Sequence, residues 1–212
     1  MQDALAQMVD TPQLLALAAA LGWASGIRLY LATFVAGLAG YMNWIDLPTG
    51  LHMLQHPAVM ATSGALMFTE FFADKIPLVD SLWDMVHTVI RIPAGAALAA
   101  GALGADNATL GWIAALAGGG LAATSHASKM TTRAAVNTSP EPFSNIGVSL
   151  LEDGFVLFML WLSATHPVIF AGLLAVTLVV SVVLLVVLVR FLRVVVRRLS
   201  TFFSGRGSPQ GS

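Results

Sequence analysis

The chain has 212 residues, of which 57% are hydrophobic and only 10% are charged. Soluble domains carry about 25% charged residues, so this composition excludes an ordinary soluble protein. The absence of cysteine excludes disulfides, thiolate metal sites and a cysteine nucleophile. No basic patch with interleaved aromatic residues is present, so we expect no nucleic-acid partner. The lipid bilayer is the expected partner.

A helix needs about 20 apolar residues to cross the hydrocarbon core of a bilayer. Six segments approach or exceed that length, and we predict six spanning helices at residues 11–40, 57–76, 79–103, 108–135, 145–165 and 167–196. The predicted fold class is therefore all-α, a polytopic transmembrane helix bundle that forms one domain over residues 1–203. The Gly/Ser-rich segment 204–212 is predicted to be a disordered tail.

The first span is long and contains a cluster of small residues. We expect it to begin with Thr11 as the cap and Pro12 in the first turn. Glycine and serine residues at 22–26 precede Arg28 in the middle of the segment. Such a cluster favours a bend or a break, so we predict that this helix is interrupted near Arg28.

The second span carries Glu70 and Asp74 one helical turn apart, so the two carboxylates face the same way. Two acids in this position repel each other unless a cation lies between them. This arrangement suits a proton carrier or a cation site. The alternative is that Asp74 belongs to the membrane interface and only Glu70 is buried.

The third span carries Asp80, Asp84, His87 and Arg91 at intervals of a helical repeat, which places them on one face. His87 and Arg91 lie deep in an apolar segment, so we expect both to be buried. Asp80 lies close to the start of the helix, where the helix dipole favours an acid, and we expect it at the interface.

The fourth span carries a second stripe, formed by His126, Lys129 and Arg133. It follows three glycines at 118–120, which permit close approach of another backbone. The stripe predicts either an anion site or an ordinary positively charged anchor on the cytoplasmic side.

The fifth span contains the adjacent acids Glu152 and Asp153. Adjacent residues of a helix point about 100° apart, so we expect the two acids not to share a partner. At least one of them should meet Arg28, Arg91 or Lys129, because an unpaired charge inside a membrane is costly.

Lysine and arginine residues outside the apolar cores indicate the orientation. Lys75, Lys129, Arg133 and the arginines at 190–206 all lie on one side of a six-span protein. We therefore predict a protein of the cell inner (cytoplasmic) membrane with both termini in the cytoplasm.

Three-span halves at residues 11–104 and 105–200 would insert in opposite orientations, as inverted repeats do. An Ala-Ser pair close to a basic residue occurs at 24–28 and again at 127–129. Matches of small residues are common by chance, so an inverted repeat and a chance match both remain open.

Metal chemistry has weak support in the sequence. Asp84 and His87 could ligate a metal together with Glu70 or Glu152, as in bundle carboxylate sites. However, no Glu-x-x-His, His-Glu-x-x-His, Gly-x-Ser-x-Gly or phosphate-loop motif occurs. We expect no cofactor. The sequence favours a protein without enzymatic activity over an enzyme, and both an enzyme and metal binding remain open.

Three blocks of sequence are distinctive when taken together. They are Gly-Trp-Ala-Ser-Gly-Ile-Arg at 22–28, the acidic segment from Glu-Phe-Phe-Ala-Asp-Lys-Ile-Pro through Asp-Ser-Leu-Trp-Asp at 70–84, and the segment at 126–142 from His-Ala-Ser-Lys through Asn-Thr-Ser-Pro-Glu-Pro. With these blocks the chain resembles the bacterial membrane family catalogued as domain of unknown function 4126, over about residues 12–165. The resemblance implies a membrane protein and no particular activity, and it leaves the sixth span outside.

These features favour a small integral membrane transporter, with proton coupling as one option. Its substrate would be an anionic or zwitterionic solute or a lipid headgroup. The alternatives are a membrane-embedded metal-dependent enzyme and a structural or assembly subunit, and a homo-oligomer also remains open. The predicted pathway residues are Arg28, Glu70, Asp74, Asp84, His87, Arg91, His126, Lys129, Arg133, Glu152 and Asp153.

Overall fold

The computed structural model describes residues 2–76, 78–104, 107–138 and 142–204. The elements are α1 (Gln2–Tyr41), the 3₁₀ helix η1 (Thr49–Gln55), α2 (Pro57–Ala73), α3 (Val79–Leu103), α4 (Ala108–Val136), α5 (Pro142–Thr165) and α6 (Pro167–Ser204). No strand occurs in these ranges, so the predicted all-α class is confirmed. The tail predicted at 204–212 lies outside the described residues from 205 onward.

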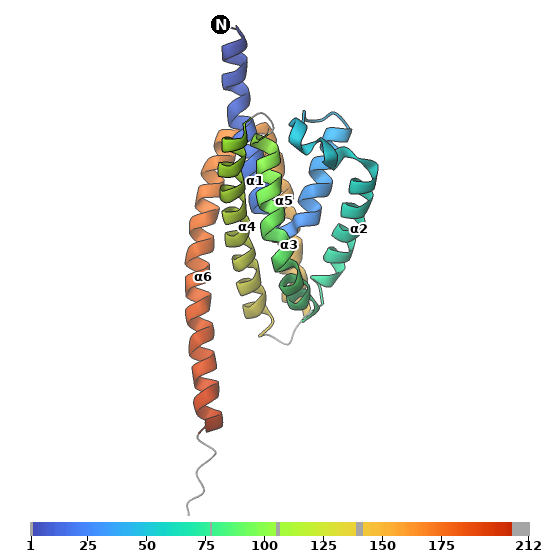
Figure 1. Cartoon of the computed structure of the whole chain (residues 1–212). Coiled ribbons are helices and arrows are strands. Elements are labelled where there is room, and N and C mark those ends of the chain that lie inside the picture. The colour runs from blue at the N-terminus through green and yellow to red at the C-terminus, as the bar shows by residue number, and fades with distance from the viewer. Residues whose placement is uncertain (1, 77, 105–106, 139–141, 205–212) are drawn as a thin grey trace, which may run out of the picture.

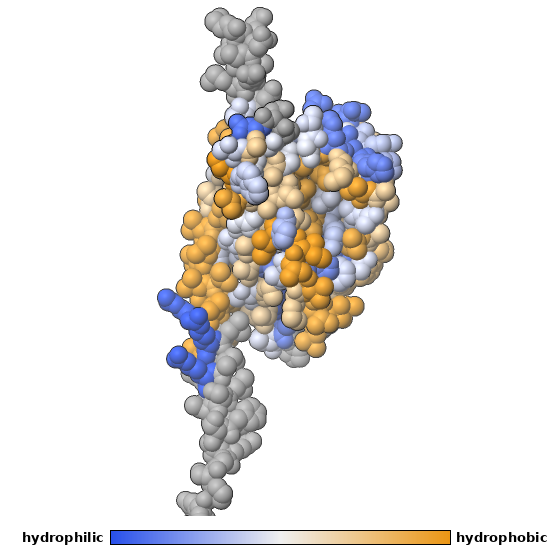
Figure 2. Space-filling view, in the orientation of Figure 1, coloured by the Kyte–Doolittle hydropathy of each residue, from blue (hydrophilic) through white to orange (hydrophobic). Residues whose placement is uncertain are grey.

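The bundle exposes apolar side chains and buries charged ones. Val89 of α3, Leu151 of α5 and Val179 of α6 are exposed, whereas Arg91 and Glu70 are buried. Hydrophobic surface covers much of the middle of the bundle, and hydrophilic residues gather towards its ends (Figure 2). This pattern is typical of a protein in a bilayer, where lipid covers the apolar surface and the charged side chains pair with one another inside the bundle.

Five helices are long and apolar enough to cross a membrane, by length and composition alone. They are α1 over Thr11–Tyr41, α3, α4, α5 over Phe143–Thr165 and α6 over Pro167–Phe191. The chain is therefore a multi-pass helical membrane protein. The second predicted span is shorter than expected, because α2 has 17 residues and ends at Ala73.

The long helix α1 folds back on itself at Arg28. The backbone of this residue is non-helical, with φ −141° and ψ 69°. Leu17 and Ala39 line one cavity of about 400 Å³, although a straight helix would separate them by roughly 33 Å. Figure 1 shows the chain entering the bundle as a first arm (residues 2–27) and returning towards the same end as a second arm (residues 29–41). The predicted break near Arg28 is confirmed.

The start of α1 differs from the prediction. The helix begins at Gln2 rather than at a Thr11 cap, and Pro12 lies inside it. Proline inside a helix removes one i→i−4 hydrogen bond and crowds the carbonyl group of residue i−4, and α1 continues through Pro12 despite this cost. Residues ahead of Pro12 extend beyond the bundle as helix (Figure 1).

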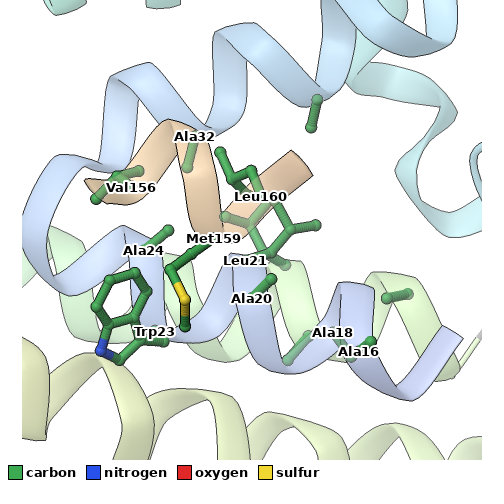
Figure 3. Close-up of a cluster of buried hydrophobic side chains, with 14 of the residues drawn as sticks. Ala16, Ala18, Ala20, Leu21, Trp23, Ala24, Ala32, Val156, Met159 and Leu160 are labelled. Atoms are coloured by element: carbon green, nitrogen blue, oxygen red, sulfur yellow. The ribbon is translucent and has the colours of Figure 1, made fainter. Parts of the chain in front are cut away.

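Helix α5 packs between the two arms of α1. In Figure 3, Val156 and Met159 of α5 lie between Ala24 of the first arm and Ala32 of the second. All four side chains are buried. Burial of apolar surface on both sides of α5 holds the arms open, so this packing positions Arg28 inside the bundle.

The first arm also lies directly against α4. A methyl group added at Gly22 would come within 2.8 Å of the Cα of Gly118, and one added at Gly26 within 2.2 Å of the carbonyl oxygen of Ala122. Only glycine allows two backbones to approach this closely. The predicted close approach at the triple glycine is thus seen at Gly118, whereas Gly120 has no neighbour within 4 Å of its added methyl group.

Helices α2 to α6 alternate in direction along the bundle (Figure 1). Because α1 returns to the end from which it enters, the N-terminal end of α1 and the C-terminal end of α6 lie at opposite ends of the bundle. The expectation that both termini face the cytoplasm assumed that α1 crosses the membrane once, and this arrangement does not fit it. The inverted repeat stays a prediction, and α4 lacks the break that interrupts α1.

Candidate functional site

Arg28 occupies the fold-back of α1 and is almost completely buried. Its guanidinium forms an ion pair with Asp74, which caps the C-terminal end of α2. On the other side, Arg28 Nε lies 2.8 Å from Asp153 Oδ1, and Nη2 lies 3.4 Å from Glu152 Oε2. Arg28 Nη2 also donates to the hydroxyl of Ser149 at 2.9 Å. The fold-back is therefore tied to α2 and to α5 through one side chain.

The break at Arg28 frees backbone carbonyl groups at the end of the first arm. Lys129 Nζ donates to the carbonyl oxygen of Ile27 at 3.2 Å, and His126 Nδ1 lies 3.1 Å from the carbonyl oxygen of Gly26. Cations are favourable at a helix C-terminus, and carbonyls freed inside a membrane need donors. The stripe on α4 meets this requirement.

The acidic and basic stripe of α3 faces the same centre. Arg91 forms an ion pair with Glu70 of α2, and its Nη1 lies 2.8 Å from Asp84 Oδ1. Lys129 Nζ lies 3.0 Å from the same Asp84 oxygen and 2.8 Å from Asp74 Oδ2. The prediction that His87 and Arg91 are buried is confirmed.

Arg133 links the network to the ends of α3 and α5. Its Nη2 lies 2.7 Å from Glu152 Oε2, and its Nη1 donates to Asn145 Oδ1 at 2.9 Å. Asp80 lies 4.0 Å from Arg133 and accepts two hydrogen bonds from Asn137 Nδ2, at 3.0 and 3.1 Å. Asp80 and Asp74 are fully buried. Asp80 lies in the first turn of α3, as expected, and Asp74 lies at the end of α2, but basic side chains of α4 cover both acids, so neither faces solvent.

The two histidines of the stripes take no part in the ion pairs. His87 stacks on Trp83 with ring centroids 4.2 Å apart, and its Nδ1 lies 2.7 Å from the Trp83 carbonyl oxygen. His126 Nε2 lies 2.8 Å from the hydroxyl of Thr88. His126 thereby links α4 to α3, and the ring of His87 meets that of Tyr30 of α1 edge-on at a centroid distance of 5.6 Å.

Four bases and six acids are joined by ion pairs into one connected network. The bases are Arg28, Arg91, Lys129 and Arg133, and the acids are Glu70, Asp74, Asp80, Asp84, Glu152 and Asp153. Nine of the eleven predicted pathway residues belong to it. Asp80, Asn137, Asn145 and Ser149 were not among those predicted. The polar stretch of sequence at 137–145, which contains both asparagines, is a signal that could have identified them.

The carboxylates of the network do not converge as metal ligands. Among the described residues, no group of three or more histidine, aspartate and glutamate side chains is placed to hold an ion. Glu70 and Asp84 instead face the guanidinium of Arg91. The set proposed from the sequence, Asp84 and His87 with Glu70 or Glu152, is not brought together as a metal site.

Two cavities reach the network from different sides. The α2 cavity, of about 360 Å³, is lined by Arg28, Glu70 and Asp153 together with apolar side chains. The α6 cavity, of about 390 Å³, is lined by Lys129 and Glu152, and its other lining residues include five with hydroxyl groups. Glu152 and Asp153 thus line different cavities while both pair with Arg28, which corrects the expectation that they would not share a partner.

Comparison of the chain with curated proteins and with solved structures gives no match. The family model described as "Domain of unknown function (DUF4126)" matches residues 15–188. The match extends into α6, so the expectation that the sixth span lies outside the family is wrong. The chain belongs to this family of unknown function, as the three sequence blocks indicated.

Proposed function

We propose that this protein is a small proton-coupled membrane transporter whose substrate carries an anionic group. The observation that carries the proposal is the position of Arg28. It lies at a break in a helix inside the bundle, and three carboxylates from two other segments share its guanidinium. Secondary transporters commonly build substrate and ion sites from broken helices of this kind.

The ion pairs of Arg28 suggest how a proton and an anion would be coupled. As long as Asp74, Glu152 and Asp153 are ionised, they neutralise the guanidinium and exclude another anion. A proton that binds one of these carboxylates, or Glu70, whose charge also acts on Arg28, removes a negative charge from the site. Arg28 then attracts an anion more strongly, so the proton and the anion bind together and leave together.

The two cavities supply routes to the network. The α6 cavity places Lys129 beside the hydroxyl-bearing residues Ser128, Thr132 and Ser181. An ammonium group with surrounding hydroxyls can hold a phosphate or carboxylate group, whether on a free solute or on a zwitterionic or anionic lipid headgroup. A free solute, a zwitterionic headgroup and an anionic headgroup can each carry this group. Separate measurements of solute transport and of lipid movement distinguish the solute from the lipid.

We further propose five membrane crossings, by α2 to α6, in the cell inner membrane. Arg190, Arg193 and Arg197 lie near the C-terminal end of α6, and arginine is enriched on the cytoplasmic side of such membranes. The connectors at the opposite end, residues 42–48 and 104–107, contain neither lysine nor arginine. This orientation places the C-terminal end of α6 in the cytoplasm and the start of α1 outside.

A structural or assembly role is the second candidate, because each of the four bases already has a carboxylate partner. Such a closed network could serve only to hold helices together. Exchange of the charges of Glu70 and Arg91 would distinguish the two roles. If the network is structural, the folded double variant should behave like the native chain in the assay described next. If the network is a transport site, the double variant should fold but lose the acidification that the native chain shows.

The proposal is tested in proteoliposomes that contain a pH-sensitive dye. An inward proton gradient is applied with chloride, inorganic phosphate, acetate or glycerol phosphate outside, and a fluorescent phospholipid reports headgroup movement in parallel. We expect acidification with at least one of these anionic groups, lost in Arg28→Gln and kept in Arg190→Gln, whose side chain is exposed. Acidification equal to that of empty liposomes with every probe, and no lipid movement, would contradict a transporter.

A further inference from the structure

Two carboxylates that line the α2 cavity each have one buried oxygen without a hydrogen-bond partner. The side chain of Glu70 is 1% exposed. Its Oε1 forms the ion pair with Arg91, whereas Oε2 has no hydrogen-bond partner. Asp153 Oδ1 pairs with Arg28, and Asp153 Oδ2 also lacks a hydrogen-bond partner. Both residues line the α2 cavity.

The charges of the network do not balance when every group is ionised. Its six carboxylates exceed its four bases by two. Lys75 also acts on Asp153 but forms none of these ion pairs. It is half-buried, and its Nζ lies 3.0 Å from the centroid of the Phe71 ring. Burial of a carboxylate charge without a compensating cation costs on the order of several kcal/mol, so neutralisation by a bound cation is favourable.

The charged groups around Glu70 come from four elements. Arg91 of α3, Lys129 of α4 and Arg28 of α1 are the cations that act on it, and Asp74 at the end of α2 is the opposing acid. Each of these cations also pairs with another carboxylate: Arg91 with Asp84, and Arg28 and Lys129 with Asp74. Glu70 therefore shares its compensating cations with the other acids, and Tyr30 of α1 also lies close to it.

We propose that Glu70 is the proton-binding site of this protein, loaded through the α2 cavity, with Asp153 as the second proton acceptor in the same cavity. The inference rests on the proposed transport function and deepens it, because it names the group that binds the coupling proton. The proton adds to Oε2 of Glu70, where a carboxylic acid can form without displacing Arg91 from Asp84.

The lining of the α2 cavity favours a proton over a metal cation. Apart from Arg28, Glu70 and Asp153, it consists of Leu31, Met67, Phe68, Phe71 and Leu157, which offer no side-chain oxygen. Hard metal cations take about six or more oxygen ligands. A proton needs a single carboxylate oxygen, which Glu70 provides.

Proton binding can be read directly by infrared difference spectroscopy of the full chain in lipid nanodiscs during a pH titration. We expect the carbonyl band of a protonated carboxyl group, lost in Glu70→Gln and unchanged in Asp46→Asn, a variant of an exposed connector residue. Asp153→Asn should leave that band and alter its titration. Thermal unfolding of each variant verifies that it is folded.

A second measurement uses the native chain, in case Glu70→Gln fails to fold. Isotope labelling of glutamate carboxyl groups should shift the band, and labelling of aspartate should not. A band that survives Glu70→Gln in folded protein, a band that shifts only with labelled aspartate, or no band at all would overturn the assignment. Displacement of the signal by sodium but not by potassium at constant pH would overturn it in favour of a metal cation.

The infrared titration tests the proton site, and the proteoliposome assay tests the transporter, so either proposal can be rejected without the other. A Glu70 band in a protein that moves no probe would retain the proton site and reject the transporter. Anion-dependent acidification without a Glu70 band would retain the transporter and place its proton elsewhere.

Discussion

Arg28 and Asp153 join the fold-back of α1 to the middle of α5, with Arg28 Nε 2.8 Å from Asp153 Oδ1. The contact brings together a helix break and a membrane-spanning helix that are distant in the sequence. It also places Arg28 on the wall of the α2 cavity. The network is therefore a structural support of the fold-back as well as the candidate site, and variants must separate these two roles.

Loss of the Arg28 charge should be strongly destabilising. Arg28→Gln leaves Asp74 and Asp153 short of a partner, and removal of one member of a buried ion pair costs about 3–5 kcal/mol. The double variant Arg28→Gln with Asp74→Asn should recover part of this loss, because it removes the stranded charge. Unfolding in mixed micelles with increasing sodium dodecyl sulfate measures the free energy. Additive effects of the two substitutions would contradict the pairing.

The triple glycine of α4 offers a matched pair of substitutions. A methyl group at Gly118 would lie 2.3 Å from Ala99 Cβ and 2.6 Å from the Gly95 carbonyl oxygen, whereas one at Gly120 meets nothing within 4 Å. Gly118→Ala should cost about 1–3 kcal/mol through overpacking. Gly120→Ala should be neutral or stabilising by up to about 1 kcal/mol, because alanine favours a helix. Thermal unfolding of the purified variants tests the contrast, and equal effects would be evidence against the close approach of α3 and α4.

Asn137 should anchor the end of α4 to the start of α3. Its Nδ2 donates to both oxygens of Asp80 and to Ser81 Oγ at 2.9 Å. Asn137→Ala should cost about 1–3 kcal/mol, because a buried acceptor loses its donor, and Asn137→Asp should cost more through repulsion. Thr138→Ala is the control, since the Thr138 hydroxyl donates within its own turn, to the carbonyl oxygen of Ala135. Chemical unfolding curves in detergent measure these differences, and an effect of Asn137→Ala no larger than that of the control would refute the anchor.

Residue spacing predicted which side chains share a face of a helix. The stripe of α3 from Asp84 to Arg91 and the stripe of α4 from Lys129 to Arg133 follow from the helical repeat alone, and both face the network. The ends of α3 and α4 also lie within one residue of the predicted ends. The pattern of apolar residues with one glycine cluster likewise predicted a break near Arg28.

The angle of that break could not be predicted, because it depends on how α5 packs between the two arms. Residues 11–41 are apolar, and their mean hydropathy is the same whether the helix folds back or runs straight. The burial of Asp74 and Asp80 escaped prediction for a similar reason. Both lie at helix ends, where acids commonly face solvent, and only the tertiary position of Lys129 and Arg133 covers them.

The fold-back of α1 is the central claim, because it places Arg28 within the membrane and the two ends of the described chain on opposite sides. The chain has no cysteine, so single cysteines can be introduced at Gln13, Asp46 and Arg193, which are all exposed. A membrane-impermeant maleimide is then applied to sealed right-side-out and inside-out vesicles. We predict that Gln13→Cys and Asp46→Cys react from the same side and Arg193→Cys from the other. Reaction of Gln13→Cys and Asp46→Cys from opposite sides would show that α1 crosses the membrane and would contradict this account.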